Sequence, residues 1–327
     1  MCLVAWGVFP AHGATPEKCS ILLFAPNATP SAFSPDAFRR EFARESLATS
    51  RCEVLVREAD ILNAGRLVEQ VDAALATTPS IIIAPGSLVA LTVRARESSI
   101  PILFVAVASP EVIGLIENRA APEANLTGLT YAMQERVKMF EVIRELVGEK
   151  PRIGVVVDRF WPTLPASAEL VRTVKKDLGA EVRLFAGDTS EEVLAEVRSL
   201  RGPPMDAWVI PDTPLGRDGG AAIVAALRRR PGIVIVNIPE LLEAGAHVLM
   251  HPVIEHPTKT LAEMADLILR GVPLRRIPVV HPKRFAVAVN VPAVESTPGV
   301  RWKRLMAIAD SFRYDSGQAK DSPASRR

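Results

Sequence analysis

The chain lacks the features that mark several special classes of protein. It contains no run of about 18 apolar residues, so the sequence predicts no membrane-spanning helix. Its net charge is only +2, which argues against a surface dedicated to nucleic acid. The densest basic run, Arg228–Arg230, falls near the end of an expected helix, where cations complement the helix dipole. A soluble globular protein that does not bind nucleic acid is therefore expected.

Enzyme signatures are also scarce. The sequence has no Gly-x4-Gly-Lys-Ser/Thr phosphate loop, no Gly-x-Gly-x-x-Gly after a strand and no Gly-x-Ser-x-Gly elbow. Three histidines gather in the segment His247–His256, but Pro252 and Pro257 interrupt the single helix that would place them on one face. The sequence therefore predicts no catalytic centre, no cofactor and no metal site.

Cysteine is rare as well, and its positions bear on export. Residues 1–19 are expected to be a leader, the remnant of a signal peptide, because an apolar stretch is followed by small residues near position 13. The positive charge that usually opens such a peptide is missing. Cleavage near Gly13 or Ala14 would leave Cys19 and Cys52, each directly before an expected strand. Neighbouring parallel strands would bring both to one edge, where they either form a disulfide in an oxidising compartment or remain as two thiols.

From residue 20 onward, strand-like and helix-like segments alternate, which predicts parallel sheets covered by helices. The first set comprises strands at Ile21–Ala25, Glu53–Arg57, Ser80–Ala84 and Pro101–Ala106 and helices at Pro35–Ala48, Asn63–Ala76 and Leu88–Glu97. The second comprises strands at Arg152–Asp158, Glu181–Ala186, Ala207–Ile210 and Ile233–Asn237 and helices at Ala166–Leu178, Ser190–Leu200 and Gly219–Arg229. Two sets of similar size predict two Rossmann-like α/β lobes.

No linker rich in proline, glycine and serine separates the two sets, which favours a short ordered hinge. The first passage is expected at 125–130, with Asn125, Thr127 and Gly128 as hinge residues. A later helix, Thr258–Arg270, is expected to return to the first lobe. The predicted division is 1–19 leader, 20–126 plus 250–282 lobe 1, 127–249 plus 283–314 lobe 2, and 315–327 disordered tail.

Polar residues follow the expected strands at their carboxyl ends, which line the ligand crevice in open α/β sheets. Asn27 follows the first strand, and Ser87 and Ser109 stand where helices begin, so the two serines either cap those helices or help to hold an anion. Asp212 follows a buried strand, as a turn residue or as the counter-ion of a ligand ammonium. Trp161 either stacks on an apolar part of a ligand or packs on a lobe surface.

The chain resembles the ABC transporter substrate-binding proteins of the tryptophan/tyrosine type, which are similar to type 1 periplasmic binding proteins. The resemblance runs from about residue 20 to 292 and is carried by an ordered set of segments: Ile100–Val107 with Ser109-Pro110, Asn125–Gly128, Met139–Val147, Pro211–Thr213, Ala262–Pro273, Ile277–Val279 and Ala288–Asn290. The sequence departs from the family at Ser109, where relatives usually carry an acid.

The resemblance implies a periplasmic, monomeric protein whose two lobes, joined by a multi-strand hinge, close on a small solute and deliver it to a membrane permease. It implies a binding protein and not an enzyme. We expect Ser87 and Ser109 to hold an anionic group, Asp212 a cationic group, and Trp161 to cover the apolar part, as an amino acid or similar zwitterion requires. Two alternatives remain: an extracytoplasmic sensory module, and an enzyme of doubly wound fold.

Overall fold

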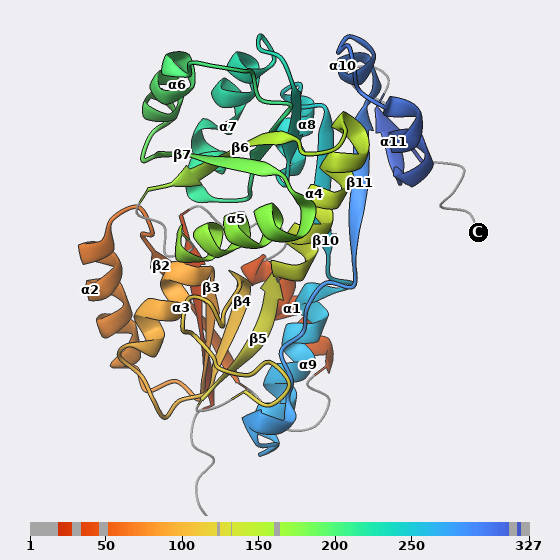
Figure 1. The fold of residues 1–327 in the computed structure, drawn as a ribbon. Coiled ribbons are helices and arrows are strands. Elements are labelled where there is room, and N and C mark those ends of the chain that lie inside the picture. Colours follow the sequence, from red (N-terminus) through yellow and green to blue (C-terminus); the bar gives the residue numbers. More distant parts are fainter. Residues whose placement is uncertain are drawn as a thin grey trace, which may run out of the picture.

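The computed structural model of the chain describes residues 19–27, 34–45, 52–122, 125–131, 133–159, 164–313 and 319–321. Within these ranges the chain forms two stacked α/β lobes, each built on one sheet (Figure 1). The predicted fold, two parallel sheets flanked by helices, is confirmed.

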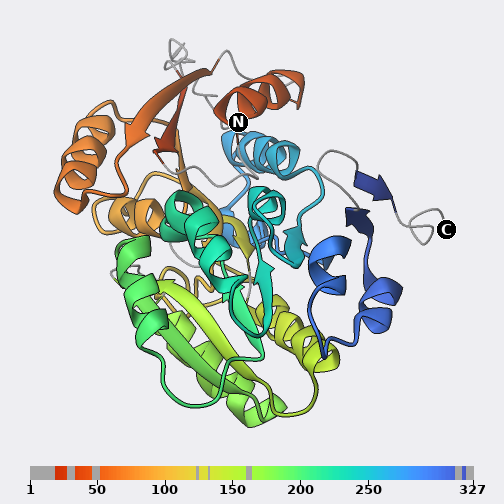
Figure 2. The same cartoon turned by 90° about the horizontal axis from the view of Figure 1, so that it is seen from above.

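The first sheet has five strands, all parallel, in the order β2–β1–β3–β4–β5. Their bounds are β1 Ser20–Pro26, β2 Glu53–Ala59, β3 Ile81–Pro85, β4 Ile102–Ala108 and β5 Leu126–Tyr131. Residues of β1 alternate between two cores because successive side chains point to opposite faces. One face packs against α2 (Ala64–Leu75) and α3 (Ser87–Arg94), and the other against α1 (Pro35–Glu45) and α9 (Pro257–Leu269). Helices α1 and α9 lie side by side although they are far apart in sequence (Figure 2).

The second sheet has the order β13–β12–β11–β10–β9–β8–β6–β7. Its bounds are β6 Arg152–Asp158, β7 Glu181–Gly187, β8 Ala207–Ile210, β9 Ile233–Val236, β10 Val248–Val253, β11 Arg284–Asn290, β12 Ser311–Arg313 and β13 Ala319–Asp321. The five strands from β7 to β10 are parallel, whereas β11 runs antiparallel to β10 and β13 antiparallel to β12. The predicted parallel sheet is therefore extended at one edge by a hinge strand and two short C-terminal strands.

Helices cover both faces of this sheet. One face packs against α4 (Met133–Val147), α5 (Leu164–Leu178), α10 (Val291–Glu295) and α11 (Trp302–Ile308). The other packs against α6 (Ser190–Ser199), α7 (Pro214–Leu227) and α8 (Pro239–Glu243). A short 3-10 helix, η1 (Leu274–Arg276), follows α9 in lobe 1.

Three segments join the lobes. The first lies between β5, in the first sheet, and α4, whose Met139 and Phe140 pack in a core of lobe 2. The second lies between β10 and α9. The third follows Val280, which bridges to Leu129 of β5, and leads into β11. Strand β11 runs upward along lobe 2 from the level of the junction between the lobes (Figure 1).

The predicted hinge position needs correction, because Asn125, Thr127 and Gly128 all belong to lobe 1. The Asn125 amide donates to the Ile100 carbonyl at 2.5 Å, and the Thr127 hydroxyl donates to the Ile277 carbonyl at 2.7 Å. These bonds fasten β5 into the first sheet, so the chain leaves lobe 1 only after Tyr131. The second passage also comes later than predicted, because β10 continues to Val253 in the second sheet.

Three further expectations concern the cysteines and the two ends of the chain. Cys19 and Cys52 form a disulfide, with their Cα atoms 4.5 Å apart at the start of the paired strands β1 and β2. Of the expected leader, residues 1–19, all but Cys19 lie outside the described residues. The expectation of a disordered tail is wrong for Ala319–Asp321, which pair with β12 as strand β13.

Candidate functional site

Both lobes place a topological switch point at the carboxyl ends of their strands. The strand order β2–β1–β3–β4–β5 in lobe 1 is repeated by β7–β6–β8–β9–β10 in lobe 2. In each order the connections leave the first strand in opposite directions, so a crevice opens between β1 and β3 and between β6 and β8. Ligands of doubly wound proteins bind at such points. The carboxyl ends of the first sheet point toward lobe 2 (Figure 1).

At the lobe 1 switch point, Asn27 follows β1. Its side-chain amide donates to Asp60 Oδ1 at 2.9 Å, and its Oδ1 accepts from the Ile61 amide at 3.2 Å. Both ends of this amide are therefore used to tie the end of β1 to the loop after β2. Asn27 serves as a brace of the switch point in this structure.

Ser87 lies on the other side of the same switch point, as the first residue of α3. It is buried, and it follows Gly86, which has a φ of +81°. Gly86 is the N-cap and offers no side-chain hydrogen bond to the helix. The first turn of α3 therefore keeps amide groups that no capping side chain satisfies, which is the arrangement that binds anions.

Ser109 follows β4, the next strand along the sheet, and is 1% exposed. It adopts a left-handed backbone with a φ of +51°, and its hydroxyl has no hydrogen-bond partner among the described residues. The strand before it is also irregular, since its register with β5 shifts between Phe104 and Val107 around Ala106, which has a φ of +56°. Strained backbone and an unsatisfied buried hydroxyl are both features that concentrate at binding sites.

At the lobe 2 switch point, Asp158 ends β6. Its Oδ1 accepts from the Leu215 amide at 2.9 Å, in the first turn of α7 beyond β8. Its Oδ2 is buried and has no partner among the described residues. Burial raises the pKa of Asp158, while hydrogen bonds from Thr213 and Leu215 act against that shift. The carboxylate thus bridges the switch point with one oxygen and keeps the other uncommitted.

Asp212 follows β8 at the same switch point, but it is already paired. Its Oδ2 accepts from Arg217 at 2.6 Å, and the two side chains are 16% and 18% exposed. Burial raises the pKa of Asp212, and the charge and hydrogen bond of Arg217 oppose the shift. Asp212, which was expected to pair with a cationic group of the ligand, is therefore already paired with Arg217 inside the protein.

Arg217 was not predicted as a site residue, although its position in the sequence indicates that it needs an acidic partner. It lies near the start of α7, where the helix dipole disfavours a cation, so it requires a nearby anion. An acid immediately before that helix is the obvious partner. Trp161, the remaining predicted site residue, lies outside the described residues.

Two further polar residues lie at the same edge of lobe 2. His251 in β10 contacts the Asn237 carbonyl through Nδ1 at 3.2 Å, and the Asn237 amide donates to the Met250 carbonyl at 2.5 Å. His251 is close enough to Asp212 for its charge to lower the pKa of that acid. Among the described residues, no three His, Cys, Asp or Glu side chains gather around one point.

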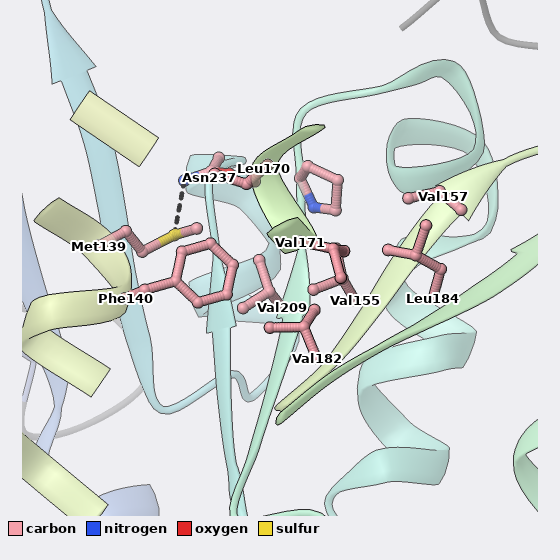
Figure 3. A pocket seen from close by; sticks show the side chains of 11 residues that line it. Met139, Phe140, Val155, Val157, Leu170, Val171, Val182, Leu184, Val209 and Asn237 are labelled. Carbon is pink, nitrogen blue, oxygen red and sulfur yellow. Dashed lines mark hydrogen bonds between the residues drawn. The ribbon is translucent and has the colours of Figure 1, made fainter. Parts of the chain in front are cut away.

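An apolar cavity of about 20 Å³ lies beside this edge, between the second sheet and helices α4 and α5 (Figure 3). It is lined by Met139, Phe140, Val155, Val157, Leu170, Val171, Val182, Leu184, Val209, Pro211 and Asn237. That volume holds about one water molecule. The cavity is therefore too small for an amino-acid-sized solute.

None of the helices described for this chain has the length and apolar character of a membrane span.

Comparisons with solved structures give the same fold. A crystal structure from Streptococcus pneumoniae, described as that of an ABC domain in complex with L-Trp, superposes with a TM-score of 0.74 at 14% identity, covering 90% of this chain and 100% of that one. A conserved domain protein from Vibrio cholerae gives 0.75 at 18% identity, covering 91% and 100%. A ligand-free, open substrate-binding protein with adhesive properties from Clostridium difficile gives 0.62 at 20% identity, covering 85% and 94%.

Sequence comparison identifies the family. No curated protein matches the sequence at a significant level. The family model of the ABC transporter substrate binding proteins, however, matches residues 59–309, well over half of the 327 residues. This family consists of extracytoplasmic binding proteins and not of enzymes. The chain therefore belongs to the ABC transporter substrate-binding protein family.

Proposed function

We propose that this protein captures a small amino-acid-like solute between its two lobes outside the cytoplasm and delivers it to an ABC permease. The observation that carries the proposal is the repeated switch point, with polar residues at the carboxyl ends of β1, β3, β6 and β8. A solute held between two such edges would contact both lobes at once.

The chemistry of the edges favours a zwitterion. In lobe 1, the uncapped start of α3 with Ser87, and the buried hydroxyl of Ser109, suit a carboxylate. In lobe 2, acidic residues stand at the ends of β6 and β8: Asp158 keeps one carboxylate oxygen for a cationic group, whereas Asp212 is paired with Arg217. Trp161 remains our proposal for covering the apolar part. The fold neighbour from Streptococcus pneumoniae, which was solved with L-Trp, supports a search that begins with amino acids.

A periplasmic location and a monomeric state are parts of the same proposal. The disulfide between Cys19 and Cys52 supports export, because such bonds persist in oxidising compartments and are rare in the cytosol.

A binding screen tests the proposed function. The purified protein is heated with each of the 20 L-amino acids, and with sugars and carboxylic acids as comparison solutes. A ligand present at 100 times its dissociation constant adds about 2.7 kcal/mol to the free energy of unfolding, which raises the melting temperature by several degrees. Hits are then measured by isothermal titration. A protein that binds none of these solutes would contradict the proposal.

A further inference from the structure

Two carboxylates meet at the lobe 2 switch point, and they differ in what they still need. Asp212 is matched by Arg217, so the pair is neutral as a unit. Asp158 has an oxygen, Oδ2, which is buried and accepts no hydrogen bond from the described part of the protein. Leaving a buried acceptor unsatisfied destabilises the folded protein, and more so when the group is charged, so the retention of this oxygen calls for an explanation.

Packing alone does not supply that explanation. The structural task of Asp158, joining β6 to the start of α7, is performed by hydrogen bonds from the Leu215 amide, at 2.9 Å to Oδ1, and from the Thr213 side chain. An asparagine could do the same through its single oxygen. A carboxylate adds a second acceptor and a negative charge at the crevice between β6 and β8, where the fold places ligands.

We infer that Asp158, and not Asp212, recognises the cationic group of the solute, and that the substrate class is therefore small solutes with a protonated amine. This inference rests on the proposed function. Asp158 Oδ2 accepts a hydrogen bond from the amine, while Oδ1 stays on the Leu215 amide. The Asp212–Arg217 pair braces the end of β8 beside it.

The test uses the Asp158→Asn variant, which keeps an oxygen for the Leu215 amide and removes the charge. Affinity is measured by isothermal titration for each amino acid that binds the wild type and for its deaminated acid, for example L-tryptophan and indole-3-propionate. A hydrogen bond to a charged group is worth about 1.5–3 kcal/mol, so the variant should bind the amino acid about 10- to 100-fold more weakly. Its affinity for the deaminated acid should change less than about 3-fold, a split that a purely structural role would not produce.

Asp177→Asn is the matched control. Asp177 is exposed near the end of α5, just before β7 begins, at the opposite edge of the sheet from the switch point. It should leave the preference for the amine unchanged. Asp158→Glu provides a second variant that retains the carboxylate, so it should bind more weakly overall while keeping the preference for the amine. Circular dichroism establishes that each variant is folded.

Several results would overturn the inference. One is an Asp158→Asn variant that still prefers the amino acid by the wild-type factor. Another is an Asp158→Glu variant that loses the preference completely. A third is a wild type that binds only amine-free solutes, which would leave solute capture intact and refute this assignment alone. Failure of the wild type to bind anything would refute the proposed function together with it.

Discussion

His247 shows how a single buried side chain can set the pH range in which the protein is stable. It is 1% exposed; its Nδ1 accepts from the Val234 amide at 2.8 Å, and its Nε2 lies 2.8 Å from the Thr297 hydroxyl. Burial, and then the neighbouring charge of Arg228, lower its pKa to about 3. Folding therefore holds this imidazole neutral, whereas in the unfolded chain it takes up a proton below a pH of about 6.5.

The pH dependence follows from that difference. The unfolded state binds the extra proton between about pH 6.5 and 3, so stability is complete above this window and is lost as the pH falls through it. The wild-type free energy of unfolding should fall relative to that of His247→Gln by about 2–3 kcal/mol from pH 7 to pH 4.5. Urea denaturation at the two pH values measures it. His281→Gln, at an exposed histidine, is the control, and a His247→Gln difference that does not change with pH would refute the account.

Asp158 and Asp212 show where sequence reasoning stops at the residue scale. Each is an acid directly after a buried strand, and the sequence alone treats them as equivalent. The structure distinguishes them, because α7 begins so that Arg217 meets Asp212 and the Leu215 amide meets Asp158. The identity of such partners depends on the exact start of a helix, which sequence patterns locate only to within about two to four residues.

At the scale of elements, Gly128 shows why β5 fits against β4. Its φ is +153°, and a Cβ at this position would lie 2.0 Å from the Phe104 carbonyl oxygen and 2.7 Å from the Phe104 amide nitrogen. These are backbone atoms in the middle of a parallel ladder, so they cannot yield as a flexible side chain can. The strand next to it carries the register shift at Ala106. The glycine is therefore needed for close approach of the two strands.

Gly128→Ala should consequently lower the free energy of unfolding by about 2 kcal/mol or more, since overpacking and backbone strain act together. Chemical denaturation measures the change. Gly65→Ala is the matched control, because Gly65 lies in α2 and its added Cβ would meet only Asn63 Oδ1, at 3.6 Å. That variant should be neutral or more stable by up to about 1 kcal/mol. Equal effects in the two variants would contradict the close-approach argument.

The sequence predicted the type of most elements, because short continuous apolar runs such as β1, β3 and β4, bounded by turn residues, are typical of strands buried on both faces. It misplaced the first passage between lobes. Asn125-Leu-Thr-Gly128 has the composition of a turn, and composition does not distinguish a glycine that turns the chain from one that lets two strands approach. The second passage was predicted at 249–250, and β10, which carries Pro252, was not predicted as a strand.

At the scale of the whole molecule, each lobe has its own hydrophobic cores. Among the described residues, two cores cover the faces of the first sheet and two cover the faces of the second, and none of these four is shared between the lobes. The chain passes between the lobes in the three hinge segments, and the Leu129–Val280 bridge lies in lobe 1, where the third segment begins. Relative motion of the lobes therefore requires little repacking, which is the property that a two-lobed binding protein uses to close on its solute.

A solute that touches both switch points should couple the two lobes. Bound solute stabilises only conformations in which both edges contact it, so it should shift the population toward a closed form. Small-angle scattering should show a smaller radius of gyration with saturating amino acid than without it. Hydrogen exchange should slow at the amides that begin α3 in lobe 1 and α7 in lobe 2. Bound solute opposes the local unfolding that exposes these amides in each lobe that it contacts. Asp158→Asn should require a higher solute concentration for the same compaction. Slower exchange in one lobe alone, with an unchanged radius of gyration, would mean that the solute binds to a single edge and that the switch points do not act together.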